Sequence, residues 1–449
     1  MYIESALRGV IGIVLIIGIA FLFSNNKRKI DWRLVSIGII MQFVIAVLII
    51  HGETLRTWFF PLGWVKDIAN WFGNAIVAIL GFTTEGSKFV FGNLADGFSK
   101  DSIGFFFAFQ VLPTIIFVST LTAILYYFGI LQLVVKGMAF IMSKLLGISG
   151  AESLSNTANI FLGQTEAPLL VRPYIAKMTN SEILTIMIGG MATISAGVMA
   201  SYSQILGQAY SQLTKIPLAA AQLKFAVDLL AGSTMAAPAS IVIAKILFPE
   251  TSEPITKGTV KIKIEKSSSN VIEAAATGAS DGLHLALNVA GMLIAFIALI
   301  AMFNYILQNL GNNFGINSML QANFGQPLSM QLIFGILLKY VAIGIGVPAK
   351  DALQFGSLIG TKTVINEFVA YVDLANIIKT GALSEKTITM AAYALCGFAN
   401  FSSIAIQIGG ISPMAPNRKS DIAGLGLKAV LGGALATLMT ASLAGILVS

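Results

Sequence analysis

The sequence predicts an all-α polytopic membrane protein with about eight transmembrane helices, two opposed re-entrant helical hairpins, an interfacial helix and an inverted repeat with two broken helices. The 449 residues are 56% hydrophobic and only 11% charged, whereas a soluble domain carries about 25% charged residues. The segments 9–23, 34–50, 105–128 and 285–307 are free of charge and about long enough to cross a ~30 Å hydrocarbon core. These observations predict a multi-pass protein of the cell membrane.

The placement of positive charge predicts the orientation of the chain. The first apolar run is followed by Lys27, Arg28 and Lys29, and Lys and Arg favour cytoplasmic loops. We therefore expect a retained first helix, with the N-terminus and the C-terminus both outside. A net charge of +7 would also suit a nucleic-acid binder, but such proteins gather basic residues on a solvated face of a soluble domain. No nucleic-acid partner is predicted.

Three tryptophans predict the interfacial helix. Trp58, Trp64 and Trp71 lie in a stretch that contains Pro61 and Gly63. Proline and glycine interrupt helices, and amphipathic aromatic side chains favour the boundary between membrane and water. We expect this stretch to be too interrupted to span the membrane and to lie along its outer surface.

Two apolar regions contain too many polar residues to face lipid. These are residues 153–178, which include Glu166, and residues 332–373, which include Glu367. Each is long enough to enter the membrane and return, so we predict two re-entrant hairpins buried among other helices. Each hairpin is followed, roughly 30 residues after its glutamate, by a helix with small and polar residues at its centre, 192–198 and 397–403. Interrupted segments in matching positions are typical of inverted-repeat transporters and mark the binding site.

This pattern divides the chain into five predicted parts. The first part comprises N-terminal transmembrane helices, the interfacial helix and scaffold, and a further scaffold helix lies between the two hairpin repeats of the transport core. The boundaries are 1–150 for the N-terminal part, 151–248 for the first repeat, 249–282 for a cytoplasmic linker, 283–329 for the scaffold helix and 330–449 for the second repeat.

The two hairpin glutamates require either an ion-pair partner or a functional role, because an ionised carboxylate near the membrane centre costs roughly 2.5–3.5 kcal/mol on insertion scales. One hypothesis is a structural ion pair with Arg172 or Lys362. The other is a polar ligand site in which the carboxylates accept hydrogen bonds. Asn400 and Ser403 are three residues apart and share one helix face, which suits either a ligand site or polar packing between helices.

Other residues exclude several classes of function. His51 and His284 are far apart in the sequence and do not have the spacing of a metal motif or a catalytic triad, and Cys396 is the single cysteine. The sequence contains no phosphate-binding loop. The sequence therefore predicts no enzyme, no cofactor and no use of ATP. Asn159 and Thr193 carry oxygens of the kind that a hard cation binds.

Several motifs resemble those of the concentrative nucleoside transporter family. Residues 163–170 read GQTEAPLL and residues 360–371 read GTKTVINEFVAY, which resembles the family's signature. Residues 237–239, 271–290 and 396–400 are also similar to family motifs, in the same order along the chain. The resemblance implies a homotrimer in which each protomer has eight spanning helices, two opposed hairpins, an interfacial helix and its own nucleoside site.

The resemblance also implies which residues bind the substrate. The first hairpin and its broken helix would hold the base, and the second half would hold the ribose, with an aromatic ring packed against the base. By matching position, the residues that contact the base are Gln164, Thr165, Glu166 and Val198. Those that contact the ribose are Glu367, Asn400 and Ser403, and the aromatic ring is that of Phe398.

Sodium coupling is implied in the same way. The side chains of Asn159 and Thr193 and the backbone carbonyls of Leu162 and Ile194 match the family's sodium site, and residues 165–168 look like the sodium-coupled form. Residues 195–197 read SAG where many members read AGS, which moves a hydroxyl by two positions. We expect a sodium-coupled symporter that imports ribonucleosides such as uridine by alternating access. The alternatives are a proton-coupled nucleoside symporter, a channel, and a membrane-embedded enzyme that acts on a nucleotide-linked or lipid substrate.

Overall fold

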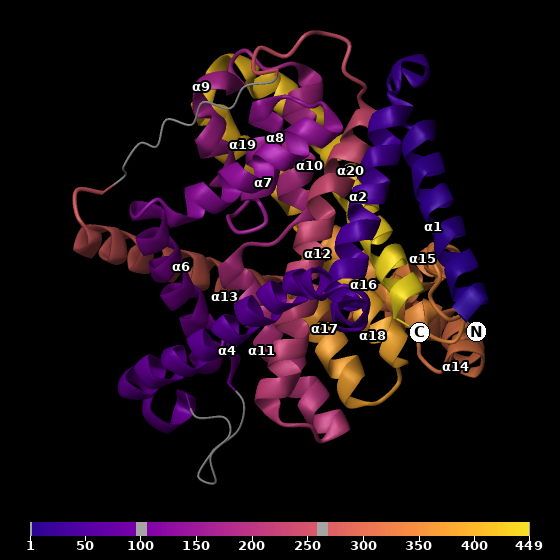
Figure 1. The fold of residues 1–449 in the computed structure, drawn as a ribbon. Helices are drawn as coiled ribbons and strands as arrows, with labels where there is room; N and C mark the ends of the chain where they lie inside the picture. The colour runs from indigo at the N-terminus through magenta and orange to yellow at the C-terminus, as the bar shows by residue number, and fades with distance from the viewer. Residues whose placement is uncertain (1, 96–105, 258–267, 449) are drawn as a thin grey trace.

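The computed structural model describes residues 2–95, 106–257 and 268–448, and within these ranges the fold is entirely helical (Figure 1). Part of the predicted cytoplasmic linker, residues 258–267, lies outside the described residues. The α-helices, in chain order, are α1 (Tyr2–Leu22), α2 (Trp32–Ile50), α3 (Gly52–Trp58), α4 (Trp64–Phe91), α5 (Phe107–Gln110), α6 (Leu112–Tyr127), α7 (Ile130–Leu146), α8 (Gly150–Ala158), α9 (Arg172–Ile175), α10 (Asn180–Ala192), α11 (Ala196–Thr214), α12 (Leu218–Leu247), α13 (Val271–Asn313), α14 (Ile316–Phe324), α15 (Met330–Gly344), α16 (Ala352–Val364), α17 (Glu367–Lys379), α18 (Glu385–Leu395), α19 (Phe401–Ile411) and α20 (Lys419–Leu447).

Seven helical stretches of the described chain are long and apolar enough to cross a membrane, and two shorter apolar helices lie at residues 7–22 and 330–344. The seven stretches are Trp32–Ile50, Phe60–Ala95, Phe107–Tyr127, Asn180–Thr214, Leu218–Leu247, Val271–Asn313 and Pro416–Leu447. The all-α prediction is therefore confirmed, while the number of spans stays a prediction.

The tryptophan-rich stretch differs from the prediction in one respect. It was expected to be too interrupted to span the membrane, but α4 runs for 28 residues from Trp64, and Phe60–Ala95 is among the stretches long and apolar enough to cross a membrane. Pro61 and Gly63 lie in a 3-10 turn (Phe60–Gly63) directly before this helix, so they define its start and do not break it. Trp64 and Trp71 are both more than half exposed, and α4 runs crosswise to α2 and α12 in Figure 1.

Capping residues set the starts of the short central helices. Ser149 begins α8 with a capping box that it shares with Glu152, and Thr179 begins α10 in the same way with Glu182. The side chain of Asn366 caps α17 and that of Asn400 caps α19. These side chains satisfy backbone N–H groups that a helix leaves free at its first turn. Short helices can therefore begin inside the protein without leaving orphaned donors.

The elements of the two predicted repeats follow one another in the same order. In the first, a hairpin of α8 and the 3-10 helix Ala167–Val171 leads through α9 to the broken helix α10–α11 and the long helix α12. In the second, the hairpin α16–α17 precedes the broken helix α18–α19 and the long helix α20. Figure 1 shows α8, α9, α10 and α19 at one end of the molecule and α11, α16, α17 and α18 at the other. The two hairpins thus approach the centre from opposite ends.

The two helix breaks meet at the centre of the molecule. Gly397 follows α18 with φ +139°, a conformation that favours glycine. A Cβ atom there would lie 2.7 Å from the backbone carbon of Ala192, the last residue of α10. A Cβ atom on Gly433 of α20 would lie 2.8 Å from the Cβ of Met191 and 3.1 Å from that of Ala399. Glycine is needed here because two unwound backbones and a long helix approach within contact distance.

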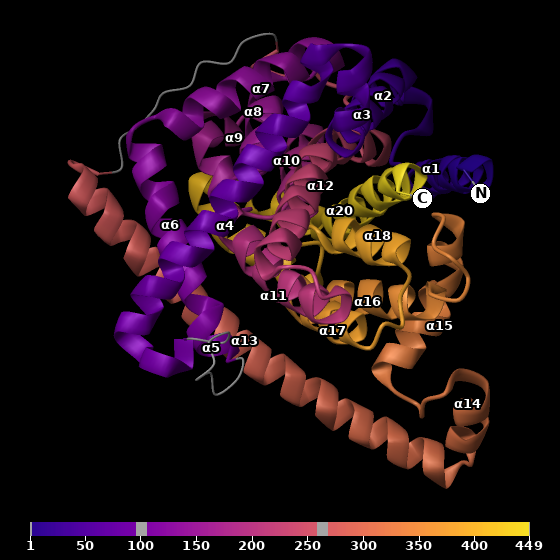
Figure 2. The ribbon, with the colours of Figure 1, turned by 60° about the horizontal axis from the view of Figure 1, so that its bottom comes forward.

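The remaining helices surround this centre unequally. The 43-residue helix α13 packs mainly along α6, and Figure 2 shows it along one side of the bundle. In contrast, α1 packs on α20, and α2 packs on α12. The helices α6 and α13 thus form a pair distinct from the helices around the two breaks. The two chain termini lie near each other in both views.

Candidate functional site

The tip of the first hairpin carries three of the predicted base residues. Gln164 is buried, and a Cβ atom on Gly190 of α10 would lie only 2.9 Å from its Cβ atom. Thr165 packs against Gly410 of α19, where a Cβ atom would come within 2.4 Å of its Cγ2. Glu166 is exposed, and its carboxylate accepts a hydrogen bond of 3.1 Å from the backbone N–H of Gly163. The tip therefore presents a carboxylate while Gln164 and Thr165 anchor it on two helices.

The second half brings together the three predicted ribose residues. Glu367 is 5% exposed, and its carboxylate accepts hydrogen bonds from Asn400 Nδ2 at 2.8 Å and from the hydroxyl of Tyr202 at 3.2 Å. The side-chain oxygen of Asn400 accepts from the backbone N–H of Ser403 at 2.9 Å. A carboxylate held by two neutral donors keeps further lone pairs for a ligand with hydroxyl groups.

One hydrogen bond joins the two halves directly. Gln164 Nε2 donates to Ser403 Oγ over 3.1 Å, although the residues are 239 positions apart. The Oε1 atom of Gln164 is buried without a partner. Val198 is buried in the first turn of α11, and Phe398 lies half-buried in the break between α18 and α19. The predicted base and ribose residues thus converge on the junction of the two broken helices.

The predicted cation residues lie beside the first break. Asn159 is fully buried, and neither Oδ1 nor Nδ2 has a hydrogen-bond partner. A hydrogen bond of 3.1 Å from the N–H of Ala196 to the carbonyl of Phe161 holds this hairpin segment against the segment that contains Thr193 and Ile194. The Thr193 hydroxyl donates to Gly189 O at 2.9 Å, which leaves its oxygen free to accept or coordinate.

This donor set fits sodium. An unsatisfied buried amide costs about 1–3 kcal/mol, and a bound cation would remove that cost for the Asn159 oxygen. Hard cations prefer neutral oxygens and carboxylates. No cluster of three His, Cys, Asp or Glu side chains that could hold a metal ion occurs within the described ranges.

Two polar residues near these side chains, Tyr202 and Gln407, were not predicted from the sequence. Tyr202 lies on α11, fully buried, with its ring 4.0 Å from that of Tyr371. Its position four residues after Val198, on the same helix face, was the available signal. Gln407 on α19 is also fully buried and donates to Met187 O at 2.9 Å, while its Oε1 has no partner. Gln407 follows Ser403 by four residues.

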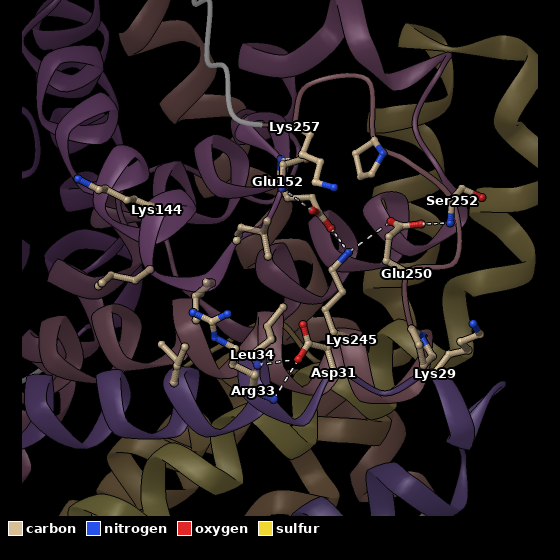
Figure 3. Close-up of a pocket in the computed structure, with 18 residues that line it drawn as sticks. Lys29, Asp31, Arg33, Leu34, Lys144, Glu152, Lys245, Glu250, Ser252 and Lys257 are labelled. Carbon is tan, nitrogen blue, oxygen red and sulfur yellow. Dashed lines mark hydrogen bonds and ion pairs between the residues drawn. The ribbon is translucent and has the colours of Figure 1, made fainter.

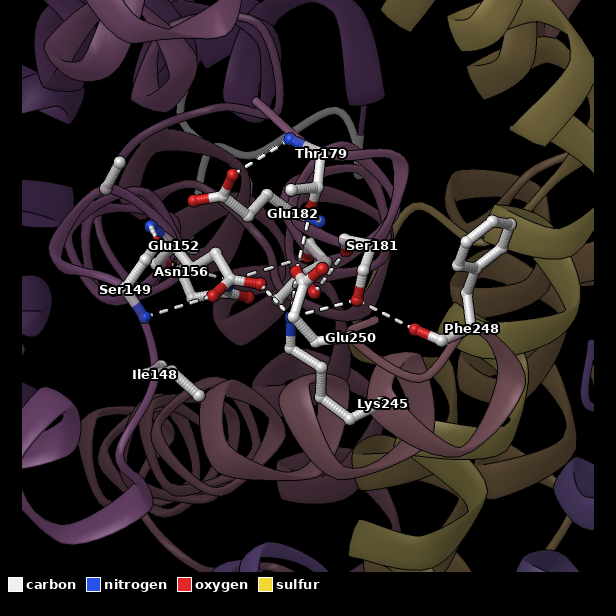
Figure 4. Close-up of polar contacts among 12 residues, drawn as sticks. Ile148, Ser149, Glu152, Asn156, Thr179, Ser181, Glu182, Lys245, Phe248 and Glu250 are labelled. Atoms are coloured by element: carbon white, nitrogen blue, oxygen red, sulfur yellow. Dashed lines mark hydrogen bonds and ion pairs between the residues drawn. The ribbon is translucent and has the colours of Figure 1, made fainter. Parts of the chain in front are cut away.

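The base of each hairpin is tied to the start of its broken helix. In the first repeat, Lys245 forms an ion pair with Glu152 of α8 and donates to Ser181 Oγ of α10 at 3.0 Å (Figure 4). In the second repeat, Asp351 accepts from Ser384 Oγ at 2.5 Å and from Thr387 Oγ1 at 2.6 Å, both at the start of α18. The anchors differ in chemistry but occupy equivalent places.

A cavity of about 420 Å³ lies away from this centre, at the first hairpin's base. Basic side chains from three separate segments line it, Lys29, Lys144 in the last turn of α7, and Lys257 (Figure 3). Lys245 and Glu152 also line it. The three lysines, far apart in the sequence, therefore lie around one cavity.

The hypothesis of structural ion pairs for the hairpin glutamates finds no support. None of the ion pairs among the described residues includes Glu166 or Glu367. Lys362 Nζ donates instead to Ala394 O at 2.8 Å and to Thr437 Oγ1 at 3.1 Å. Among the described residues neither carboxylate therefore forms an ion pair, and Glu367 is held by two neutral donors.

Known proteins are similar to this chain over nearly all of its length. A family profile described as Na+ dependent nucleoside transporter C-terminus matches residues 228–445, its N-terminal counterpart matches residues 11–94, and one described as Nucleoside recognition matches residues 108–209. The nucleoside permease NupC of Helicobacter pylori is 38% identical over 99% of both chains. The mouse sodium/nucleoside cotransporter 1 is 37% identical over 97% of this chain and 63% of its own length. An uncharacterized transporter of Haemophilus influenzae is 44% identical over 99% of this chain and 98% of its own.

Solved structures of a related protein are similar to this chain in both fold and sequence. The protein CNTnw in an inward-facing substrate-bound state is 39% identical and matches with a TM-score of 0.85 over 100% of this chain and 98% of that protein. A variant of CNTnw in an outward-facing state also matches with a TM-score of 0.85, over 100% of this chain and 99% of that one, at 38% identity. The predictions of a membrane transporter, not an enzyme, and of its family are confirmed. The chain belongs to the concentrative nucleoside transporter family.

Proposed function

We propose that this nucleoside transporter is a sodium-coupled symporter that imports ribonucleosides such as uridine by alternating access. The observation that carries the proposal is the fully buried Asn159, whose amide has no protein partner, beside the first helix break. The sodium dependence named for the matching family and for the mouse relative supports the same ion.

The site residues have distinct proposed roles toward the nucleoside. Glu367, supported by Asn400 and Tyr202, accepts hydrogen bonds from the two ribose hydroxyls. Ser403 contributes a further polar contact to the ribose. Phe398 covers the apolar face of the base, since aromatic rings stack well on planar ligands. The remaining base contacts come from Gln164, Thr165, Glu166 and Val198.

Ion binding and nucleoside binding are coupled because both depend on the tip of the first hairpin. The hairpin tip that carries Gln164 and Glu166 begins directly after Asn159 and is bonded to the first break through Phe161. A cation bound by Asn159, Thr193 and the carbonyls of Leu162 and Ile194 orders this tip, so that base contacts form only when the ion is present. One inward sodium ion at 100 mV supplies about 2.3 kcal/mol, and a tenfold gradient adds about 1.4 kcal/mol. Together they support accumulation on the order of several hundredfold.

Alternating access requires a moving part and a fixed part. The proposed fixed part is a homotrimer scaffold that includes α6 and α13, because α13 packs mainly along α6 and most of its apolar surface is exposed in a single protomer. The proposed moving part holds both hairpins, which enter the membrane from opposite sides, and both broken helices. Both chain termini face outside, and the basic loops around Lys29, Lys144 and Lys257 face the cytoplasm.

The test is uptake of radiolabelled uridine into proteoliposomes under an inward sodium gradient, compared with an equal choline gradient at constant pH. Concentrative uptake with sodium alone is expected. Uptake driven by an imposed pH gradient instead would support the proton-coupled alternative. Equilibration without accumulation under either gradient would support a channel.

A further inference from the structure

Lys362 occupies an unusual place for a lysine. It lies in the last turn of α16, in the second hairpin, and only 1% of its surface is exposed. Its ammonium group donates to the backbone carbonyl of Ala394 at 2.8 Å and to the hydroxyl of Thr437 at 3.1 Å. None of the ion pairs among the described residues includes it. The ammonium group is therefore hydrogen-bonded to two neutral oxygens.

The ammonium group lies at the end of α18, the first half of the second broken helix. The last carbonyls of a helix have no partner within it and carry partial negative charge. In α18 the carbonyl of Ala392 accepts from Tyr371 OH at 2.8 Å, that of Tyr393 accepts from the N–H of Cys396 at 3.2 Å, and that of Ala394 accepts from Lys362. The positive charge therefore lies where the helix dipole favours it.

The first repeat has matching elements at its own break. There α10 ends at Ala192, the hairpin supplies Asn159, and the long helix α12 supplies Ser233, whose hydroxyl accepts from the N–H of Ile194 at 3.4 Å. In the second repeat the hairpin supplies Lys362 and the long helix α20 supplies Thr437. Asn159 is neutral and without a partner, whereas Lys362 brings its own charge. The two repeats thus differ in whether a positive charge is built into the chain.

We propose that the ammonium group of Lys362 is a tethered cation that fills, in the second repeat, the place that a sodium ion takes in the first. The inference rests on the proposed function only for the ion at the first break. Lys362 is a positioning residue: it stabilises the unwound end of α18, and through it the segment that carries Phe398 and Asn400. One break is then permanently supplied with charge, and the other responds to the ion gradient, so one sodium ion moves with each nucleoside.

The experiment empties the tethered site and asks whether a soluble cation can refill it. In Lys362→Ala, uridine uptake into proteoliposomes should fall by about 10- to 100-fold, the range expected for loss of a hydrogen bond from a charged group. Propylammonium, which has the atoms that the substitution removes, should restore uptake. Activation by sodium should change from a Hill coefficient of about one in the wild type to about two, because a second ion site opens.

Two comparison variants separate this role from a structural one. Lys362→Arg keeps the charge and should keep a Hill coefficient of about one, with no response to propylammonium. Lys362→Gln keeps a donor for Ala394 O without the charge and should behave as the alanine variant does. Lys339→Ala, on α15, controls for general effects of the amine and should not respond to it.

Several outcomes would overturn the proposal. Wild-type transport by Lys362→Gln would show that a neutral hydrogen bond is enough. Lack of any response of Lys362→Ala to propylammonium or to added sodium would show that the site is not a cation site. If Lys362→Ala and Lys362→Gln both fail to fold, even in the presence of propylammonium or sodium, that result would also overturn the proposal. If the wild type ignores sodium, the proposed coupling fails, but the response to propylammonium still decides this inference.

Discussion

Replacement of Glu367 by glutamine is the sharpest test of the ribose assignment. The carboxylate is buried and accepts hydrogen bonds from Asn400 Nδ2 and Tyr202 OH. Glutamine has nearly the same shape, but one of its two acceptors becomes a donor. Hydrogen bonds to a charged group are worth about 1.5–3 kcal/mol, compared with about 0.5–1.5 kcal/mol for neutral ones. With two ribose hydroxyls, we expect a loss of about 2–3 kcal/mol, or roughly 30- to 150-fold in affinity.

The measurement is uridine binding to purified protein by calorimetry, with the melting temperature as a check on folding. The same titration with 2′,3′-dideoxyuridine completes a double-mutant cycle, because this ligand lacks both hydroxyls. It should bind the wild type weakly and lose little further affinity in the variant. Glu253→Gln, at an exposed glutamate that forms an ion pair with Lys257, should bind uridine like the wild type. Equal losses for both ligands, or no loss for uridine, would refute the ribose assignment.

Three further substitutions test other contacts. Glu166→Gln should weaken binding of uridine and dideoxyuridine by the same factor, since this residue is assigned to the base; a selective loss for uridine in calorimetry would contradict that assignment. Tyr202→Phe removes the 3.2 Å hydrogen bond to Glu367 and should weaken uridine binding by about 2- to 13-fold, equivalent to 0.5–1.5 kcal/mol, an effect that should vanish when Glu367 is already glutamine. Gly397→Ala, at φ +139° and 2.7 Å from the backbone of α10, should destabilise the protein by at least about 2 kcal/mol in thermal melts. Gly409→Ala, in α19 with open space around it, should stay within about 1 kcal/mol of the parent, and similar melting of the two variants would show that the breaks do not touch.

Much of the fold is visible in local sequence patterns. Long apolar runs predict spanning helices because the hydrocarbon core is thick and admits few charges. The polar residues within 153–178 and 332–373 predict hairpins because such residues need protein around them, and Asn366 and Asn400 are recognisable caps of the helices that follow. A helix was predicted near Trp64, but the length of α4 was not, because Pro61 and Gly63 were interpreted as interruptions, although proline is well tolerated where a helix begins.

The sequence by itself determined the class of the protein and its family, because these depend on hydropathy, periodicity and motifs within short windows. Tertiary structure alone decided which side chains meet. The contacts Gln164–Ser403, Tyr202–Glu367 and Lys362–Thr437 join residues 239, 165 and 75 positions apart. Such contacts depend on how helices cross at the two breaks. The residues next to a side-chain donor in the sequence do not predict which distant group will accept its hydrogen bond. For this reason Lys362 could be considered from sequence only as a partner for glutamate, whereas packing brings its ammonium group to the carbonyl end of α18.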